Sequence, residues 1–465
     1  MTVLAADPVA PRPARMAELL SRDVVRLTIG TVLLLGCNAF EIIGAATGMP
    51  AVLDDLGGVA VYGAAVAAPL VGSVLAAPLG GRLADRWGTV KPLVLSLSLF
   101  AGGLIATALA PSMALVAAGR FLTGLGGGAT LSLQLVIIAR YVEVRLRALM
   151  LAVVGTVFVI PGLIGPSVSA TLSATVGWRW IFGGVVPIVV LCAALLVPDI
   201  TRRQRVDGDS GDGEVEDRPW WGPLLLASGL AVTVLAGAAD LRWVPLAVLG
   251  IALAAFGARA TMPRGTWTAR RGFPAAVTCT IGICAAYLTS EAFLPLLLRE
   301  LRGKSLLEAG LPLTVEAVFW CCAGWYQARL RPAQRPGWAR VAALLAASGL
   351  FLAALLVFDQ VPFWLAYPAT ALGSYGCGMV FTIAQTVAVE SAPAGQEGAY
   401  TSSIQLANLL GTAIGTSATA IVIARLHGRL SLAIGITMFA TVGAALLVAV
   451  IAPRFAPATR RDAVT

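Results

Sequence analysis

Charge is the scarcest property of this 465-residue chain. Asp, Glu, Lys and Arg together make up only 12% of its residues, about half the share found in an ordinary soluble domain. Hydrophobic residues make up 58%. This composition excludes an ordinary soluble protein, so we expect a chain that crosses a lipid bilayer many times.

Side chains that carry metal or nucleophile chemistry are also scarce. His427 is the single histidine, and the seven cysteines fall in apolar runs without zinc-ligand spacing. The glycines of Gly124–Gly128 lie inside an apolar run and do not follow a strand, so they do not indicate a nucleotide site. We expect no metal, no cofactor and no enzymatic activity. We interpret His427 as a surface side chain, with pH sensing as the alternative.

The apolar runs predict an all-α polytopic membrane protein. About 20 apolar residues are needed to span a bilayer, and the sequence offers fourteen such runs. The runs near 220–239 and 243–261 are short and could instead be a re-entrant pair, which would leave twelve spans. The candidate spans cover roughly 27–53, 59–83, 90–110, 113–141, 147–176, 180–198, 220–239, 243–261, 273–298, 306–330, 341–358, 362–389, 397–426 and 432–451.

Polar stretches divide these spans into parts. Residues 199–219 are rich in Gly and Asp and predict a flexible cytosolic linker. Weak echoes between the two halves, such as the glycines and glutamine of 124–134 and 373–385, suggest a parallel repeat. The expected parts are a cytosolic tail (1–26), a six-helix bundle (27–198), the linker (199–219), an inserted helix pair (220–261), a second six-helix bundle (262–453) and a cytosolic tail (454–465).

The basic residues predict the orientation. Most Lys and Arg residues fall in loops on the side of the N-terminus, which places both termini in the cytoplasm. The net charge of +9 follows from these loops and does not indicate nucleic-acid binding. Arginine greatly outnumbers lysine, as in GC-rich genomes, so we expect the cell membrane of a bacterium.

One charged turn between two apolar runs has a distinctive pattern. Its residues Gly81, Asp85, Arg86, Gly88 and Lys91 resemble the signature between helices 2 and 3 of the major facilitator superfamily, apart from Thr89, where the family has a basic residue. The resemblance implies two six-helix bundles around a central substrate cavity, with these five residues as a conformational gate. We expect Asp85 to face the N-terminal end of the helix near Glu397 and to hold the cytoplasmic side shut. Glu397 would compete for that positive end.

Four ionisable residues fall deep within predicted spans. Each costs at least about 2.5–3.5 kcal/mol at mid-membrane, so Glu41, Arg120, Glu291 and Glu316 are functional candidates. Glu41 stands nine residues before Pro50 and Arg120 opens an Arg-x-x-x-Gly-x-Gly run; both elements resemble the fourteen-helix drug:proton antiporters. The resemblance implies that Glu41 carries the proton, and Arg120 could tune its proton affinity. A structural glutamate and a snorkelling arginine are the alternatives.

Other polar and glycine-rich positions complete the prediction. Gly162, Gly165 and Pro166 resemble part of the antiporter motif, which would bend this helix or serve only its packing. Polar residues at steps of three and four predict cavity-lining faces, with hydrogen bonding between helices as the alternative. The predicted substrate cavity comprises Asn38, Thr123, Thr130, Gln134, Tyr287, Glu291, Glu316, Trp320, Gln385, Gln405, Asn408 and Thr412.

These observations predict a proton-coupled secondary active exporter of small amphipathic compounds, working by alternating access. Its partners would be protons, the bilayer and substrates that are cationic or lipid-like; it would act as a monomer, driven by the proton gradient. An exporter of lipids or metabolites with the same fold remains an alternative. A membrane sensor or scaffold that transports nothing is a third reading.

Overall fold

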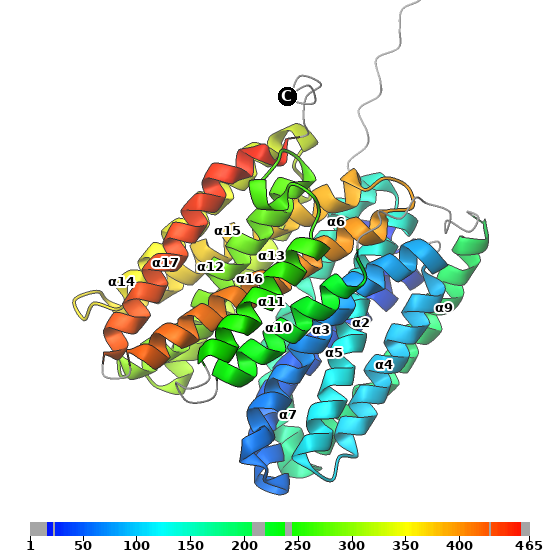
Figure 1. The fold of residues 1–465 in the computed structure, drawn as a ribbon. Coiled ribbons are helices and arrows are strands. Elements are labelled where there is room, and N and C mark those ends of the chain that lie inside the picture. The colour runs from blue at the N-terminus through cyan, green and yellow to red at the C-terminus, as the bar shows by residue number, and fades with distance from the viewer. Residues whose placement is uncertain (1–15, 22–23, 207–218, 238–243, 427–428, 457–465) are drawn as a thin grey trace, which may run out of the picture.

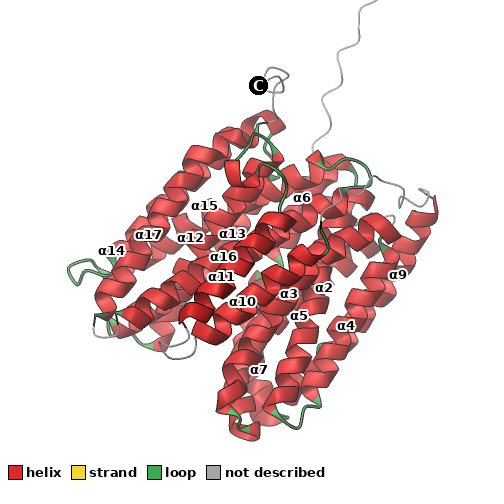
Figure 2. Ribbon diagram, viewed as in Figure 1, coloured by secondary structure: helices red, strands yellow, loops and turns green. Residues whose placement is uncertain are grey.

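The computed structural model describes residues 16–21, 24–206, 219–237, 244–426 and 429–456. All regular structure in these ranges is helical, as Figure 2 shows, which confirms the predicted all-α fold. The N-terminal bundle follows the short α1 (Met16–Leu19) and contains α2 (Val25–Leu56), α3 (Val59–Trp87), α4 (Val90–Ala108), α5 (Met113–Tyr141), α6 (Val144–Thr156), α7 (Val159–Thr175), α8 (Arg179–Gly183) and α9 (Val186–Val206). The C-terminal bundle contains α12 (Phe273–Glu300), α13 (Leu306–Gln327), α14 (Arg335–Leu355), α15 (Ala366–Ser391), α16 (Glu397–Arg425) and α17 (Leu430–Ile451).

The two bundles repeat one packing scheme. In the first, α5 packs on α3 and α4, while α2 packs on α7 and α9. In the second, α15 packs on α13 and α14, while α12 packs on α16 and α17. Each bundle has its own apolar core, since Phe100 and Met150 are fully buried in the first and Ile283 and Ile404 in the second. This correspondence confirms the parallel repeat that the glycine echo suggested.

The bundles meet at the end of the molecule where α9 stops and α10 (Trp221–Gly237) begins, which we call the linker end. There α3 packs on α16, and α6 packs on α13 (Figure 1). The hydrogen bonds and ion pairs that join Arg140, Asp85 and Thr156 of the first bundle to the second lie at the linker end or between it and Thr156. At the other end, called the opposite end, Asp55 accepts hydrogen bonds from Trp178 and Arg179 within the first bundle. These contacts hold the pKa of Asp55 below its usual value.

The inserted pair forms an antiparallel hairpin of α10 and α11 (Val244–Thr261). It lies across the line where the bundles meet, packing on α3 and touching α16 (Figure 1). The two helices approach closely because Gly229 and Gly257 face backbone atoms of the partner helix. At about 1.5 Å per residue, the 17 residues of α10 rise about 26 Å, slightly less than a bilayer core.

The structure corrects two predicted boundaries. The fifth predicted span is split into α6 and α7 at Val157–Phe158, because Pro161 cannot donate to Val157 and its ring crowds that carbonyl. Gly162, Gly165 and Pro166, which were predicted either to bend the helix or to serve its packing, lie inside α7, after the break. The sixth span is likewise interrupted, between α8 and α9.

The predicted flexible linker begins too early. Helix α9 continues to Val206, through residues assigned to the linker from position 199. Asp199 is buried and pairs with Arg202 and Arg203, three and four residues on, which supports another two turns of helix. The remaining linker residues 207–218, the predicted tails 1–15 and 457–465, and His427 lie outside the described residues.

Candidate functional site

The two deep charges of the N-terminal bundle form one ion pair. Glu41 on α2 and Arg120 on α5 are each 5% exposed, and Arg120 Nη1 lies 3.1 Å from Glu41 Oε1. Arg120 Nε donates to the carbonyl of Ala65 on α3, and its guanidinium lies over the ring of Phe182. Three helices and an aromatic ring therefore hold the arginine in place beside a carboxylate that water hardly reaches.

The polar face of α5 is packed against a neighbouring helix. The Asn38 amide on α2 donates to Thr130 Oγ1, and Gly127 faces the Asn38 carbonyl oxygen. Thr123 and Thr130 also donate to carbonyls of their own helix. The prediction that Asn38, Thr123, Thr130 and Gln134 line a wet cavity is wrong for this conformation, since all four are at most 3% exposed. Glycine at position 127 brings the helices close enough for polar side chains to bond each other.

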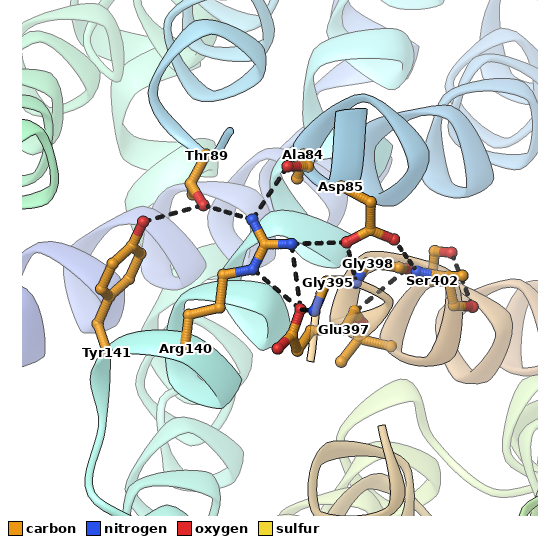
Figure 3. Close-up of polar contacts among 11 residues, drawn as sticks. Ala84, Asp85, Thr89, Arg140, Tyr141, Gly395, Glu397, Gly398 and Ser402 are labelled. Atoms are coloured by element: carbon orange, nitrogen blue, oxygen red, sulfur yellow. Dashed lines mark hydrogen bonds and ion pairs between the residues drawn. The ribbon is translucent and has the colours of Figure 1, made fainter. Parts of the chain in front are cut away.

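Asp85 lies at the centre of a second charged site, at the linker end (Figure 3). Its two carboxylate oxygens accept hydrogen bonds from the backbone N–H groups of Gly398 and Ala399, both at 2.8 Å. These are first-turn amides of α16, where the helix dipole favours negative charge. The expected contact between Asp85 and the N-terminal end of this helix is therefore present, and it joins the two bundles.

Arg140, at the linker end of α5, completes this site and escaped the sequence analysis. Its Nη2 donates to Asp85 Oδ1 at 2.7 Å and to Glu397 Oε2 at 3.1 Å, and its Nη1 donates to Thr89 (Figure 3). Glu397 was expected to compete with Asp85 for the helix end, but its carboxylate turns to Arg140 and to the amide of Gly395. One arginine thus pairs with both acids. The sequence offered one signal for this residue, since Arg140 lies at the end of the same predicted span as Arg120.

We call Asp85, Arg140, Glu397 and the amides of Gly398 and Ala399 the latch. Gly88 ends α3 with φ +74°, which favours glycine, and a side chain there would collide with Gln204. Arg86 and Lys91 are exposed outside the latch. Of the five predicted gate residues, the structure therefore brings Asp85 and Gly81 against the other bundle and leaves Arg86 and Lys91 at the surface.

Gly81 allows the closest contact between the bundles. A Cβ added at Gly81 would collide with the Gly398 carbonyl and lie 2.8 Å from the Cβ of Ser402. Overpacking of this kind costs about 1–3 kcal/mol, and the strain is relieved if the bundles separate. We therefore expect Gly81→Ala to open the linker end and to raise maleimide labelling of Ser402→Cys by roughly 5–150-fold.

The matched control for this substitution is Gly102→Ala on α4, where an added Cβ meets nothing within 4 Å. Labelling is measured in a background lacking Cys322, since the native thiol there is exposed. Equal labelling rates in Gly81→Ala and Gly102→Ala would show that the glycine contact does not hold the linker end shut.

A second junction lies between α6 and α13. Trp325 Nε1 donates to Thr156 Oγ1 at 3.0 Å, and Gly324 faces Ala152. Thr156 is the last residue of α6, directly before the break at Val157. The broken helix therefore has one half fixed to the C-terminal bundle, while α7 continues along α2.

The C-terminal bundle has its own charged pair at the linker end. Both guanidinium Nη atoms of Arg335 on α14 donate to the carboxylate of Glu390 on α15. In the repeat, α14 and α15 correspond to α4 and α5, so Glu390 lies on the counterpart of the helix that carries Arg140. Arg335 lies on the counterpart of α4, whereas Asp85 is on α3. This pair was not predicted from the sequence.

The remaining predicted cavity residues are not gathered in one place. Tyr287, Glu291 and Glu316 line a small cavity inside the C-terminal bundle, and Trp320 packs against Phe381. Gln385 and Gln405 are each 9% exposed. Asn408 and Thr412, further along α16, are half-buried, and the Thr412 hydroxyl donates to the Asn408 carbonyl.

A family model described as Major Facilitator Superfamily matches residues 31–416. The chain belongs to this superfamily of transporters. The human organic anion transporter MFSD10 has the same fold, with a TM-score of 0.70 over 93% of this chain and 100% of that one, at 16% identity. The fold of this chain is therefore shared with a solved transporter structure.

Two sequence relatives are more specific in name. A Mycobacterium tuberculosis protein named "probable multidrug-efflux transporter" is 31% identical over 224 residues, which is 47% of each chain. A Gibberella fujikuroi protein named "efflux pump" is 26% identical over 324 residues, 64% of this chain and 57% of its own. This member of the superfamily thus spans about half the length of the curated relatives it matches. Both of these relatives are named as efflux proteins.

Proposed function

We propose that this protein exports small amphipathic compounds in exchange for protons, by alternating access between its two bundles. The observation that carries the proposal is the Glu41–Arg120 pair, a carboxylate and a guanidinium that are each 5% exposed. Such a pair is expensive to bury and adds little stability. A transporter can use such a pair. The carboxylate can bind a proton when it is exposed to water, and the nearby arginine, which favours the ionised carboxylate, promotes the release of that proton.

The contacts between bundles supply the alternation. The latch and the Trp325–Thr156 bond close the linker end, and the described residues show no comparable polar junction toward the opposite end. We assign the linker end to the cytoplasm, in line with the basic loops, so the structure corresponds to a state closed to the cytoplasm. In this state Glu41 would take its proton from the outside.

The names of the relatives and the antiporter-like elements around Glu41, Arg120 and Pro166 support export over uptake. The substrate class is supported by charge. Because Arg120 neutralises Glu41, the carboxylates of Glu291 and Glu316 are left to favour cationic amphipaths.

The test is transport of ethidium, an amphipathic organic cation, by the full chain in proteoliposomes. An imposed pH gradient should drive ethidium accumulation against its own gradient, and a protonophore should abolish it. Ethidium movement that is the same with and without the pH gradient would contradict proton coupling.

A further inference from the structure

Two acids of the C-terminal bundle have no counterpart to Arg120. Glu316 lies at the middle of α13, and Glu291 lies nine residues before the end of α12. Among the residues that the structure describes, neither carboxyl group has a cationic partner. The remaining deep acid of the protein, Glu41, does have one. The pair therefore needs another way to lower its charge in a low-dielectric interior.

The positions of the two carboxyl groups indicate that a shared proton lowers the charge of the pair. Glu291 and Glu316 line the same small cavity together with Tyr287, so their carboxyl groups lie close enough to interact with each other. Two ionised carboxylates can only accept, so neighbouring carboxyl groups can hydrogen-bond each other only when one of them carries a proton. Glu316 is 8% exposed, and its Oε2 has no hydrogen-bond partner. A buried ionised oxygen without a donor is costly, and a shared proton removes most of that cost.

The surroundings contain nothing that would hold a second negative charge. The small cavity beside the pair is lined by Tyr287 and Ser290 on α12, by apolar and glycine positions on α14, and by Thr370 on α15. The other titratable groups near the pair are Tyr287 on the same helix and Cys377 on α15. Both are neutral in their ordinary state. Glu291 is only half-buried, so a proton can reach the pair through it.

The pair is also mechanically connected to the junction between the bundles. Glu316 and Trp325 lie on one helix, nine residues or about 13 Å apart, and Trp325 bonds Thr156 of the other bundle. Losing the shared proton would leave two negative charges in contact, and their repulsion would separate α12 from α13. A movement of α13 would reach the Trp325–Thr156 bond.

We propose that Glu291 and Glu316 form a second proton-binding site, which holds one proton between them and exchanges it with water during the transport cycle. No other bond changes in this step. The inference rests on the proposed function, because the pair exchanges its proton only in a cycle in which Glu41 exchanges its own. Glu41→Gln therefore loses both protons, whereas a change at the pair loses only the second. It predicts that two protons are exchanged for each substrate molecule.

The first test is the infrared spectrum of the reconstituted protein near neutral pH, which shows a carbonyl band for each protonated carboxyl group. The wild type should show a band that is lost in the double variant Glu291→Gln/Glu316→Gln. The band should remain in Glu308→Gln, which changes an exposed acid of the same helix. If the double variant fails to fold, Glu316→Gln alone should weaken the band, because half-buried Glu291 then ionises. An unchanged band in these variants would overturn the proposal.

The second test is the sign of the current when ethidium is added to proteoliposomes on a solid-supported membrane. When two protons move in one direction and one monovalent ethidium moves in the other, one net positive charge moves in the direction opposite to the ethidium. The wild type should give this reversed current. Glu291→Gln and Glu316→Gln should lose the reversed current, and the ethidium transport that remains in them, slowed or not, should still respond to a pH gradient.

The outcomes separate the two proposals. If the wild type responds to the pH gradient but gives no reversed current, the proposed proton coupling stands and the second proton-binding site is contradicted. Variants that keep the full reversed current would also overturn the second site. A wild type that ignores the pH gradient contradicts the proposed function itself, whereas the infrared band still reports whether the pair holds a proton.

Discussion

Replacing Glu41 by Gln abolishes proton-driven accumulation of ethidium in our account, while exchange down the ethidium gradient persists. Gln cannot bind and release a proton, so the two bundles can still alternate but the coupling is lost. The amide oxygen of Gln can still accept from Arg120 Nη1, now 3.1 Å from Glu41 Oε1, which limits the damage to folding. A fully uncompensated Arg120 would cost about 3–5 kcal/mol.

The measurement compares uphill and downhill ethidium flux in the same proteoliposomes. The matched control is Glu143→Gln, which changes a carboxylate that is 64% exposed at the linker end and should leave both fluxes unchanged. If Glu41→Gln still accumulates ethidium in response to a pH gradient, the proton is carried elsewhere and the Glu41–Arg120 pair is structural.

The second large effect is expected from Asp85→Asn. Both Asp85 oxygens accept backbone amides of α16, but Asn has one oxygen and would turn an N–H₂ group toward one of those donors. The substitution also removes the charge that pairs with Arg140 at 2.7 Å. Losing a charged buried hydrogen bond costs about 1.5–3 kcal/mol, which should shift the equilibrium away from the closed linker end by roughly 10–150-fold.

This shift can be measured as a distance between spin labels at the opposite end, one on each bundle. Leu109→Cys and Asp359→Cys are exposed loop positions suited to this. In Asp85→Asn the distance distribution should move toward shorter values as the linker end opens, and transport should fall. Arg86→Gln, an exposed neighbour in the same turn, serves as the control and should match the wild type. An unchanged distance distribution in Asp85→Asn would reduce this stretch to a topological signal.

The sequence predicted the parts of the site that depend on a local pattern. Spacing and composition placed Asp85 at a turn, and the N-terminal end of the helix after Glu397 was the one positive helix end proposed for it. The deep position of Glu41 and Arg120 followed from hydrophobic runs alone. The contact between them depends on how α2 and α5 pack, which no spacing within one helix determines.

What the sequence did not reveal depends on contacts between distant segments. Arg140 looked like an ordinary basic residue at the end of a predicted span, because its partner Glu397 lies on the distant helix α16. The pair of Arg335 and Glu390 was not predicted, because the spacing within either helix does not show that these two side chains meet. The polar face of α5 was taken for a cavity wall, because periodicity shows that residues share a face but not whether water or another helix covers it.

The measurement that tests proton exchange most directly runs the coupling in reverse. Proteoliposomes with a trapped pH indicator and little buffer are given an inward ethidium gradient and no pH gradient. Because coupling is reciprocal, ethidium entering the wild type should drive protons out and make the lumen alkaline, and Glu41→Gln should give no such change. Ethidium entry without alkalinisation in the wild type, or the same alkalinisation in Glu41→Gln, would contradict a proton exchange centred on the Glu41–Arg120 pair.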